Sequence, residues 1–327
     1  AVTLDGSENM QPDFVWTKDR EADSSHDLYD SVRGVGKRIR SDANGAEATN
    51  SDMITAFSTD GFTVGTQDGV QYSTNDGVAW CWRMGTSFSN DASATSVGSI
   101  DSSGTISTTA GQSIISWTGT GSAATIAHGV GVVPKSIWVK NRDQNDDFYI
   151  YHVANGNTHS ILLNSTGAKV GAYTDNWNNT TPTSSVFSVG SSNSTGGSSN
   201  DNMIAYVFSD IKGYSKFGSY TGNGNADGPF VFLGFRPAFI MQKRTDSSSN
   251  WTIVDNKRDV DNIVNTQVIA NGSGAEFSEN VFDFLSNGFK IKAVHGGYLN
   301  ASGGTYIYMA FAESPFVNSN GVPNNAR

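Results

Sequence analysis

The chain has 327 residues, a formal net charge of −10 and only 16% charged residues. An acidic chain without a basic stripe is a poor candidate for binding nucleic acid, and no apolar run reaches the ~18 residues needed for membrane insertion. Its single cysteine, Cys81, excludes an intrachain disulfide framework and the usual thiolate set of a zinc cluster.

The composition favours short strands joined by polar turns. The chain contains 36 glycines and 11% aromatic residues, and Ser, Thr and Asn are abundant. Runs of Leu, Ala, Glu and Lys at a 3.6-residue period are almost missing, which argues against helices. The aromatic content argues against disorder. The sequence therefore predicts an all-β protein.

One signature occurs three times along the chain, as PDFVWTKDR from Pro12, PKSIWVKNR from Pro134 and PAFIMQKR from Pro237. In each copy the lysine comes six residues after the proline, and a polar residue follows twelve residues later. The lysines are Lys18, Lys140 and Lys243, and the later residues are Asp30, His152 and Asp255. Fixed offsets of this kind indicate three copies of one structural unit.

The register continues beyond these residues. A glycine lies 27 residues after the lysine in copies one and two and 31 residues after it in copy three, at Gly45, Gly167 and Gly274. The copies close on VAWCWR, MIAYVF and YIYMAF. Copies two and three open on SWTGTG and SYTGNG, and copy one has no such opening. We therefore expect the chain to begin inside a repeat of a longer parent.

Each copy alternates β-branched or aromatic residues with polar ones, and dipeptides such as Asn155-Gly156 mark hairpins. A unit of roughly 100 residues built this way predicts two packed antiparallel sheets, a jelly-roll or lectin-like β-sandwich. The predicted domains are sandwich repeats at 1–85, 113–212 and 213–316, with a Ser/Thr/Gly-rich linker at 86–112 and a polar tail at 317–327. The repeated lysine is expected to hold a turn through carbonyls or a neighbouring Asp.

The motifs predict no catalytic residue, no metal ligand and no cofactor site. GVGK at 34–37 lacks the first glycine of a phosphate loop, and the histidines show no metal-ligand spacing. Two acidic pairs, Asp146-Asp147 and Asp259–Asp261, are of the kind that glycosidases use, although solvated turn carboxylates are the simpler interpretation.

Aromatic residues in polar segments are the candidates for contact with a surface ligand, because aromatic rings form platforms for sugars. Trp177 stands next to Asp175 and Asn176, and we interpret it as either exposed or packed. Trp251 begins a repeated strand, so core packing is the simpler interpretation there. Tyr298 is a third candidate beside two glycines.

The segments FGSYTGNGNADGPFVFLGFRPAFIMQKRTDSSSNW, FDFLSNGFK and NASGGTYIYMAFAESPF resemble a repeat domain of bacteriophage tail-fibre-like proteins, frequent in phages of marine and other aquatic bacteria. AHGVGVVPKSIWVKNR and LYDSVRG are similar to further segments of that family. The resemblance covers essentially the whole chain, but it brings no established binding residue. Copy two departs most, with His152 where the other copies have Asp.

This resemblance implies a virion structural protein, most simply a tail-fibre segment that recognises the host surface. The missing catalytic motifs predict that it is not an enzyme. Its expected partners are other virion proteins, further copies of itself in a trimer, and a glycan or protein of the host cell surface. Two alternatives stay open. One is a head fibre or capsid decoration protein, and the other is a polysaccharide depolymerase.

Overall fold

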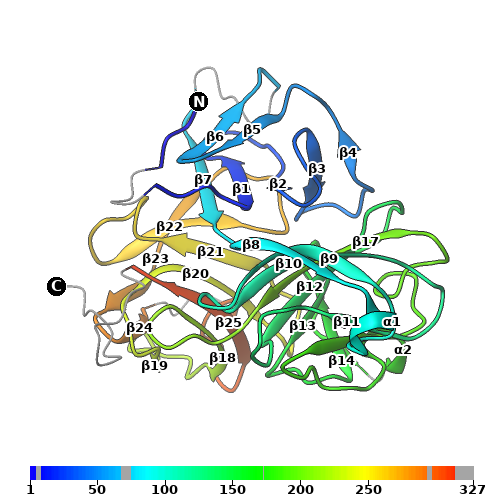
Figure 1. The fold of residues 1–327 in the computed structure, drawn as a ribbon. Helices are drawn as coiled ribbons and strands as arrows, with labels where there is room; N and C mark the ends of the chain where they lie inside the picture. Colours follow the sequence, from blue (N-terminus) through cyan, green and yellow to red (C-terminus); the bar gives the residue numbers. More distant parts are fainter. Residues whose placement is uncertain (5–8, 68–74, 172, 293–296, 314–327) are drawn as a thin grey trace.

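The structure of the chain, a computed structural model, describes residues 1–4, 9–67, 75–171, 173–292 and 297–313. These residues form antiparallel sheets and two four-residue helices, α1 (Ala92–Thr95) and α2 (Thr174–Trp177). The all-β prediction is confirmed. Figure 1 shows three lobes around a common centre, with the first unit (β1–β7) at the top, the second (β8–β17) at the lower right and the third (β18–β25) at the lower left.

The first unit is a five-stranded sheet covered by a hairpin. The sheet order is β4 (Ala48–Thr49), β3 (Lys37–Arg40), β2 (Asp27–Asp30), β1 (Phe14–Asp19) and β7 (Gly77–Trp82). The hairpin consists of β5 (Ile54–Ser58) and β6 (Gly61–Val64). Tyr29, Ile54 and Phe62 are buried between the two layers.

The second unit is an eight-stranded sheet covered by a strand pair. The sheet order is β15 (Val170–Gly171), β14 (His159–Leu162), β13 (Tyr149–His152), β12 (Ser136–Asn141), β17 (Asn202–Phe208), β10 (Gln112–Thr118), β9 (Ser102–Ser107) and β8 (Thr86–Asn90). The covering pair is β11 (Ala124–Ala127) and β16 (Val186–Val189). Trp117, Ile126 and Phe187 belong to the core between these layers.

The third unit forms both of its layers from one curled sheet. Its order is β18 (Ser215–Thr221), β25 (Thr305–Ala312), β20 (Pro237–Arg244), β21 (Trp251–Asp255), β22 (Val264–Ile269), β23 (Phe277–Leu285), β24 (Gly288–Ile291) and β19 (Phe230–Phe232). Phe289 of β24 lies across the layers from β18 and β25, with ring centroids 6.2 Å from Tyr220 and 5.5 Å from Tyr308.

The three copies of the sequence signature become equivalent strands. β1, β12 and β20 each pair on one side with the strand that carries Asp30, His152 or Asp255, and on the other with the strand that closes the unit. The openings SWTGTG and SYTGNG lie at the ends of β10 and β18, which pair with β17 and β25. The described part of the first unit has no such strand, and its sheet ends at β7.

Both faces of these strands are buried, which explains why successive residues that point to opposite faces are both hydrophobic. Val15 points into the core of its own unit, whereas its neighbours Phe14 and Trp16 point to the centre of the molecule. The same division separates Ile137 from Trp138 and Ile240 from Met241.

The inner faces of the three sheets form one shared hydrophobic core. Aromatic contacts join every pair of units there. The ring centroids of Phe14 and Tyr206 are 4.6 Å apart, those of Trp82 and Phe239 are 5.5 Å apart, and those of Phe208 and Phe311 are 6.1 Å apart. The repeats are therefore parts of one body and not independent sandwiches joined in a row.

The predicted linker at 86–112 was wrong. β8 and β9 within it extend the sheet of the second unit by pairing with each other and with β10. Its polar residues suggested a flexible segment, but Phe88, Ile100 and Ile106 pack against the outer core of that unit. Alternation with Ser and Thr fits a strand that has one face in solvent. The predicted tail at 317–327 lies outside the described residues.

A shared core predicts a single cooperative unfolding transition for the whole chain. Calorimetry should give equal calorimetric and van't Hoff enthalpies. Residues 86–212 expressed alone should lack a sharp transition and bind a hydrophobic dye, because Trp138, Tyr206 and Phe208 would be uncovered. A sharp transition in that fragment, with dispersed amide resonances, would show that the units fold independently.

Candidate functional site

The structure buries Trp177, for which the sequence left exposure and packing open. Trp177 lies in α2 with 2% of its surface exposed, and its ring meets that of Tyr151 edge-on at 5.8 Å. Its indole N–H donates to the His159 carbonyl at 3.1 Å. The neighbouring Asn176 is also buried and donates to Ser160, while Asp175 is exposed. The ligand prediction for Trp177 and Asn176 was therefore wrong, because α2 turns both side chains inward.

The other two aromatic candidates are also engaged. Trp251 is 3% exposed, and its indole N–H donates to the Leu162 carbonyl of the second unit at 2.8 Å. The burial of Trp251 agrees with core packing, the simpler interpretation of its place on a repeated strand, and contradicts the alternative of a surface ligand contact. Its bond to Leu162 also joins two units. Tyr298 is half-buried and donates its hydroxyl to the Glu279 carboxylate. The candidates lie in different layers and do not form one site.

The residues that do form a common arrangement are the repeated polar ones at the unit boundaries. Lys18, Lys140 and Lys243 are all fully buried. Each donates to carbonyls of the turn that follows its own strand, as the sequence predicted: Asp19 and Ala22 for Lys18, Gln144 and Asp146 for Lys140, and Ser249 for Lys243.

Each lysine also donates to one carbonyl of a neighbouring unit, at 3.1 Å in all three cases. Lys18 reaches Ser273 of the third unit, Lys140 reaches Asn44 of the first, and Lys243 reaches Thr166 of the second. Each acceptor immediately precedes the repeated glycine of its unit. The lysines therefore connect the units in a closed cycle, 1 to 3, 3 to 2 and 2 to 1.

Burial disfavours the charged form of these ammonium groups and so lowers their pKa values. It lowers the pKa of Lys140 and of Lys243 to about 8 and shifts that of Lys18 in the same direction. With pKa values of about 8, Lys140 and Lys243 still carry a proton at neutral pH, and an ammonium group can donate up to three hydrogen bonds to the surrounding carbonyls. Their placement suits the fixing of backbone, not proton transfer to a substrate.

Parallel contacts support the same boundaries. The backbone N–H groups of Glu47, Lys169 and Glu276 donate to the carbonyls of Arg142, Thr245 and Arg20 in the neighbouring units. Two of the three boundaries add a bidentate ion pair, Arg142 with Glu47 and Arg20 with Glu276. Within the first unit, the basic residues Arg33, Lys37, Arg38 and Arg40 form ion pairs with nearby carboxylates.

A second set of boundary contacts surrounds the repeated Asp. Asp30 accepts from Arg33 Nε at 2.5 Å and from the Tyr206 hydroxyl of the second unit at 2.6 Å. Asp255 accepts from Arg258 Nε at 2.7 Å and from the Trp80 indole of the first unit at 3.1 Å. Each carboxylate thus has an arginine three residues later and an aromatic donor from another unit.

The second unit replaces every member of this arrangement. His152 stands for the Asp, Asn155 for the Arg, and the facing position on β25 is Met309, which has no hydrogen to donate. A carboxylate there would lack both of its donors, so a neutral side chain is required. His152 Nδ1 accepts from Ala154 N at 3.2 Å, and Nε2 donates to the Tyr308 carbonyl of the third unit at 3.3 Å.

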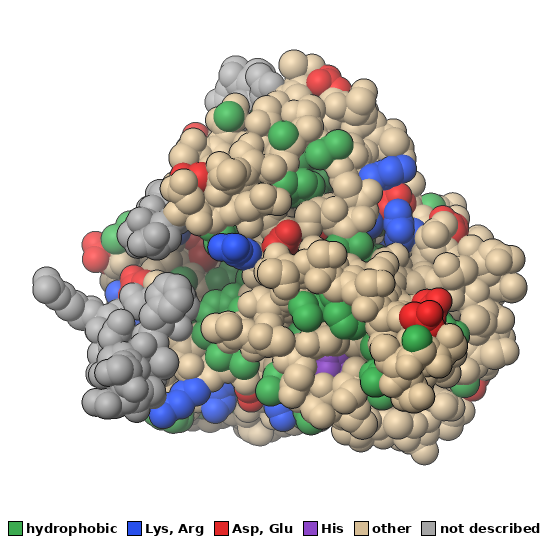
Figure 2. All heavy atoms as spheres, viewed as in Figure 1, with side chains coloured by type: hydrophobic (Ala, Val, Ile, Leu, Met, Phe, Trp, Pro, Cys, Tyr) green, Lys and Arg blue, Asp and Glu red, His purple; other side chains and the backbone are tan. Residues whose placement is uncertain are grey.

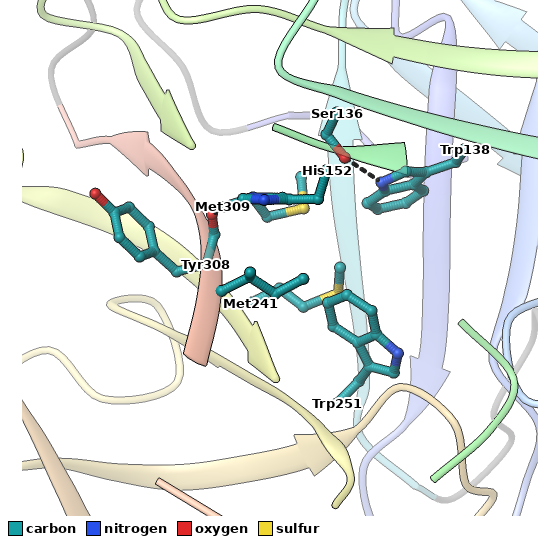
Figure 3. A pocket seen from close by; sticks show the side chains of 8 residues that line it. Ser136, Trp138, His152, Met241, Trp251, Tyr308 and Met309 are labelled. Carbon is teal, nitrogen blue, oxygen red and sulfur yellow. Dashed lines mark hydrogen bonds between the residues drawn. The ribbon is translucent and has the colours of Figure 1, made fainter. Parts of the chain in front are cut away.

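Figure 3 shows this boundary from close by, around a small cavity lined by His152, Trp138, Met241 and Met309 among other residues. The two methionines occupy the positions that Trp16 and Trp80 hold in the first unit. A methionine side chain is smaller than a tryptophan side chain, and a small cavity lies beside the two methionines. The cavity is almost wholly apolar and offers no set of convergent polar groups to a ligand.

The repeated lysines, Asp30, His152 and Asp255 thus all hold contacts between units. No group of three or more His, Cys, Asp or Glu side chains in the described segments could hold a metal ion. No helix there is long and apolar enough to cross a membrane.

The sequence indicated the lysines and Asp30, His152 and Asp255 as repeated polar residues, but it did not indicate Tyr206 or Trp80 as their partners. Tyr206 and Trp80 occupy equivalent places in the strands that close their units, and this equivalence is the sequence pattern that could have pointed to them.

A family model described as a domain of unknown function (DUF7483) matches residues 3–315. The match spans all three units, in agreement with their shared core. No curated protein and no solved structure matches the chain.

Replacement of Lys140 by Met should destabilise the protein by about 2–4 kcal/mol, because three carbonyls lose their donor. Urea unfolding would measure the loss. Lys212→Met, at an exposed lysine, is the matched control and should change the free energy of unfolding by less than about 0.5 kcal/mol. Equal effects would contradict the bridging role of Lys140.

His152→Asp should cost about 3–5 kcal/mol, because the new carboxylate is buried without an arginine or an aromatic donor. Adding Asn155→Arg recreates the pair of the other units and should recover part of that loss. Denaturant unfolding of the single and double variants gives the comparison. A double variant no more stable than His152→Asp would refute this explanation of the His–Asn–Met set.

Acid should weaken the fold through buried neutral histidines. Burial lowers the pKa of His128 and of His152 to about 4, against about 6.5 in an unfolded chain. Between these values the unfolded state binds more protons, so stability is present at pH 7 and is lost as pH falls toward 4. The free energy of unfolding should fall by about 2–3 kcal/mol per histidine. Urea unfolding at pH 7, 5.5 and 4.5 would measure this fall. His152→Gln should reduce the slope.

Proposed function

The chain belongs to the DUF7483 domain family, and we propose that it is a non-catalytic structural module of a bacteriophage virion, in a tail fibre that recognises the host surface. The module acts at the virion surface, beside other virion proteins and against a glycan or protein of the host cell. The resemblance of its repeated segments to tail-fibre-like proteins supplies the biological setting.

One structural observation carries the non-catalytic part of this proposal. The lysines that recur in all three units donate across the unit boundaries, and the Asp–Arg pairs of the first and third units each accept from an aromatic donor of another unit. Repetition in this chain therefore serves the assembly of one rigid body. A rigid body with a large outer surface suits a fibre or adhesin segment, which must keep its shape under load and present fixed contacts.

The two acidic pairs support the same interpretation. Asp259 accepts from the N–H groups of Asn265 and Thr266 and from the Thr266 hydroxyl, which fixes the start of β22. Asp147 accepts from Asn164 at 2.7 Å, and Asp146 accepts from the Asp147 N–H at 2.8 Å. Carboxylates engaged in this way hold turns, whereas a glycosidase needs a facing pair with free oxygens.

The surface gives further support. On the face drawn in Figure 2, uncharged atoms dominate, and the acidic and basic side chains are scattered with no field of one sign. Such a surface fits contact with neutral polar groups, such as the hydroxyls of a glycan, better than contact with a polyanion.

The location of the protein on the particle is the decisive test. A tag on the chain, visualised by electron microscopy of intact phage, should mark the tail fibres. Labelling of the capsid surface would favour a head fibre or decoration protein and would overturn the tail-fibre assignment.

Recognition and catalysis have separate tests. The purified chain should bind host cells and lose binding to cells stripped of their surface polysaccharide or receptor. If it released reducing ends from host glycan, and Asp147→Ala or Asp259→Ala abolished the release, the protein would be a depolymerase and the non-catalytic assignment would fail.

A further inference from the structure

Strand β19 presents two large aromatic side chains to solvent. Phe230 is 45% exposed and Phe232 is 59% exposed, while Val231 between them is buried in the core of the third unit. β19 is also the last of the described strands in its sheet, and among them it pairs with β24 alone. Exposed aromatic residues at an open sheet edge are unusual, because such edges are normally protected by charge, proline or a covering segment.

Within the described part of the chain, alternate backbone groups of β19 point away from its neighbour β24. The Pro229 carbonyl accepts from Ile291 N, and Leu233 N donates to the Asn287 carbonyl. In an antiparallel ladder the hydrogen-bonded pairs alternate, so Val231 completes this set with Phe289. The N–H and C=O groups of Phe230 and Phe232 therefore point away from β24, toward the open edge.

The surroundings of the two rings carry little net charge. Lys290, opposite Phe230, pairs with Asp227 at 2.7 Å, and Lys292 pairs with Asp283 at 3.4 Å. Gly288, opposite Phe232, leaves its space to the Phe230 ring, since a Cβ there would lie 3.0 Å from that ring. A chain with a net charge of −10 repels a second copy over most approaches, but not through this neutral face.

From these observations we propose that two copies of this chain associate by antiparallel pairing of their β19 strands across a twofold axis. Phe230 of each copy then exchanges backbone hydrogen bonds with Phe232 of the other, and the two Val231 residues face each other at the axis. The sequence Phe-Val-Phe is its own complement in this register. The four phenylalanine rings fall on one face of the combined sheet as two cross-strand aromatic pairs.

The outward-pointing backbone N–H and C=O groups of Phe230 and Phe232 favour an extended strand over a sugar as the partner at this edge. Phenyl rings offer no hydrogen-bond donor or acceptor, whereas the two residues supply two N–H and two C=O groups at strand spacing. A second copy provides the matching strand, rings and charge. This inference does not depend on the proposed function, and it joins two copies where the family resemblance implies three.

Sedimentation velocity of the full chain over a range of concentrations tests the pairing. The wild type should reach twice its 34.8-kDa mass. Phe232→Pro should stay monomeric, because the lost N–H points to the open edge and no bond to β24 is removed. Phe232→Lys should stay monomeric as well, because it places a charge at the edge. Circular dichroism and the unfolding midpoint of each variant show whether it still folds.

The matched control is Phe277→Ser, which removes a phenylalanine of 37% exposure from β23, a strand paired on both sides. It should dimerise as the wild type does. Hydrogen exchange tests which residues pair in the dimer. The amides of residues 230 and 232 should become more protected as the protein concentration rises, whereas the amide of Val231 should be protected at every concentration.

A wild type that remains monomeric overturns the proposal. So does an oligomer, trimeric or dimeric, that folded β19 variants leave unchanged, or one that forms without new protection at residues 230 and 232. Each of these results leaves the virion assignment unaffected, because that assignment is judged by particle location and host binding.

Discussion

The shared central core is the interaction on which the rest of the structure depends. Each sheet buries its outer face under a second layer of its own unit and its inner face against the other two units. A single unit removed from this arrangement would expose an inner face rich in aromatic residues, at a cost of roughly 25 cal/mol for each Å² of apolar surface. This constraint explains why repeats that are separate in the sequence form one body in space, and why the family model treats residues 3–315 as a single domain.

Polar contacts give that apolar centre a defined geometry. Hydrophobic burial alone would tolerate sliding between sheets, because it has little directionality. The lysine cycle fixes the position of each unit against its neighbour, since an ammonium group buried without its carbonyls would be very unfavourable. The Asp30 and Asp255 clusters act in the same way at two boundaries. The third boundary uses a neutral histidine because its partner strand offers Met309 and no donor, so the departure of copy two follows from a change in another copy.

These features connect the fold to the proposed role. The buried polar side chains hold the three units together. Partners can therefore contact only the outer surface, which includes the edge of β19. Among the described strands, β7 is the last in the sheet of the first unit, whereas β10, β9 and β8 extend the sheet of the second unit beyond β17. The three units thus share equivalent lysine contacts in the centre, while the margins of their sheets differ.

The sequence by itself determined the all-β class, the threefold repetition and the structural role of the lysines, because these depend on local alternation and on fixed offsets along the chain. It also indicated that Trp251 packs in the core. Only the tertiary structure decided that the units share a core, because strands buried on both faces do not reveal which unit covers the inner one. The burial of Trp177 was equally hidden, since the direction of α2 is set by packing against Tyr151 and not by its polar neighbours. The same holds for Tyr206 and Trp80, whose acceptors lie 176 and 175 residues away in the sequence, and contacts at such a separation leave no local pattern to read.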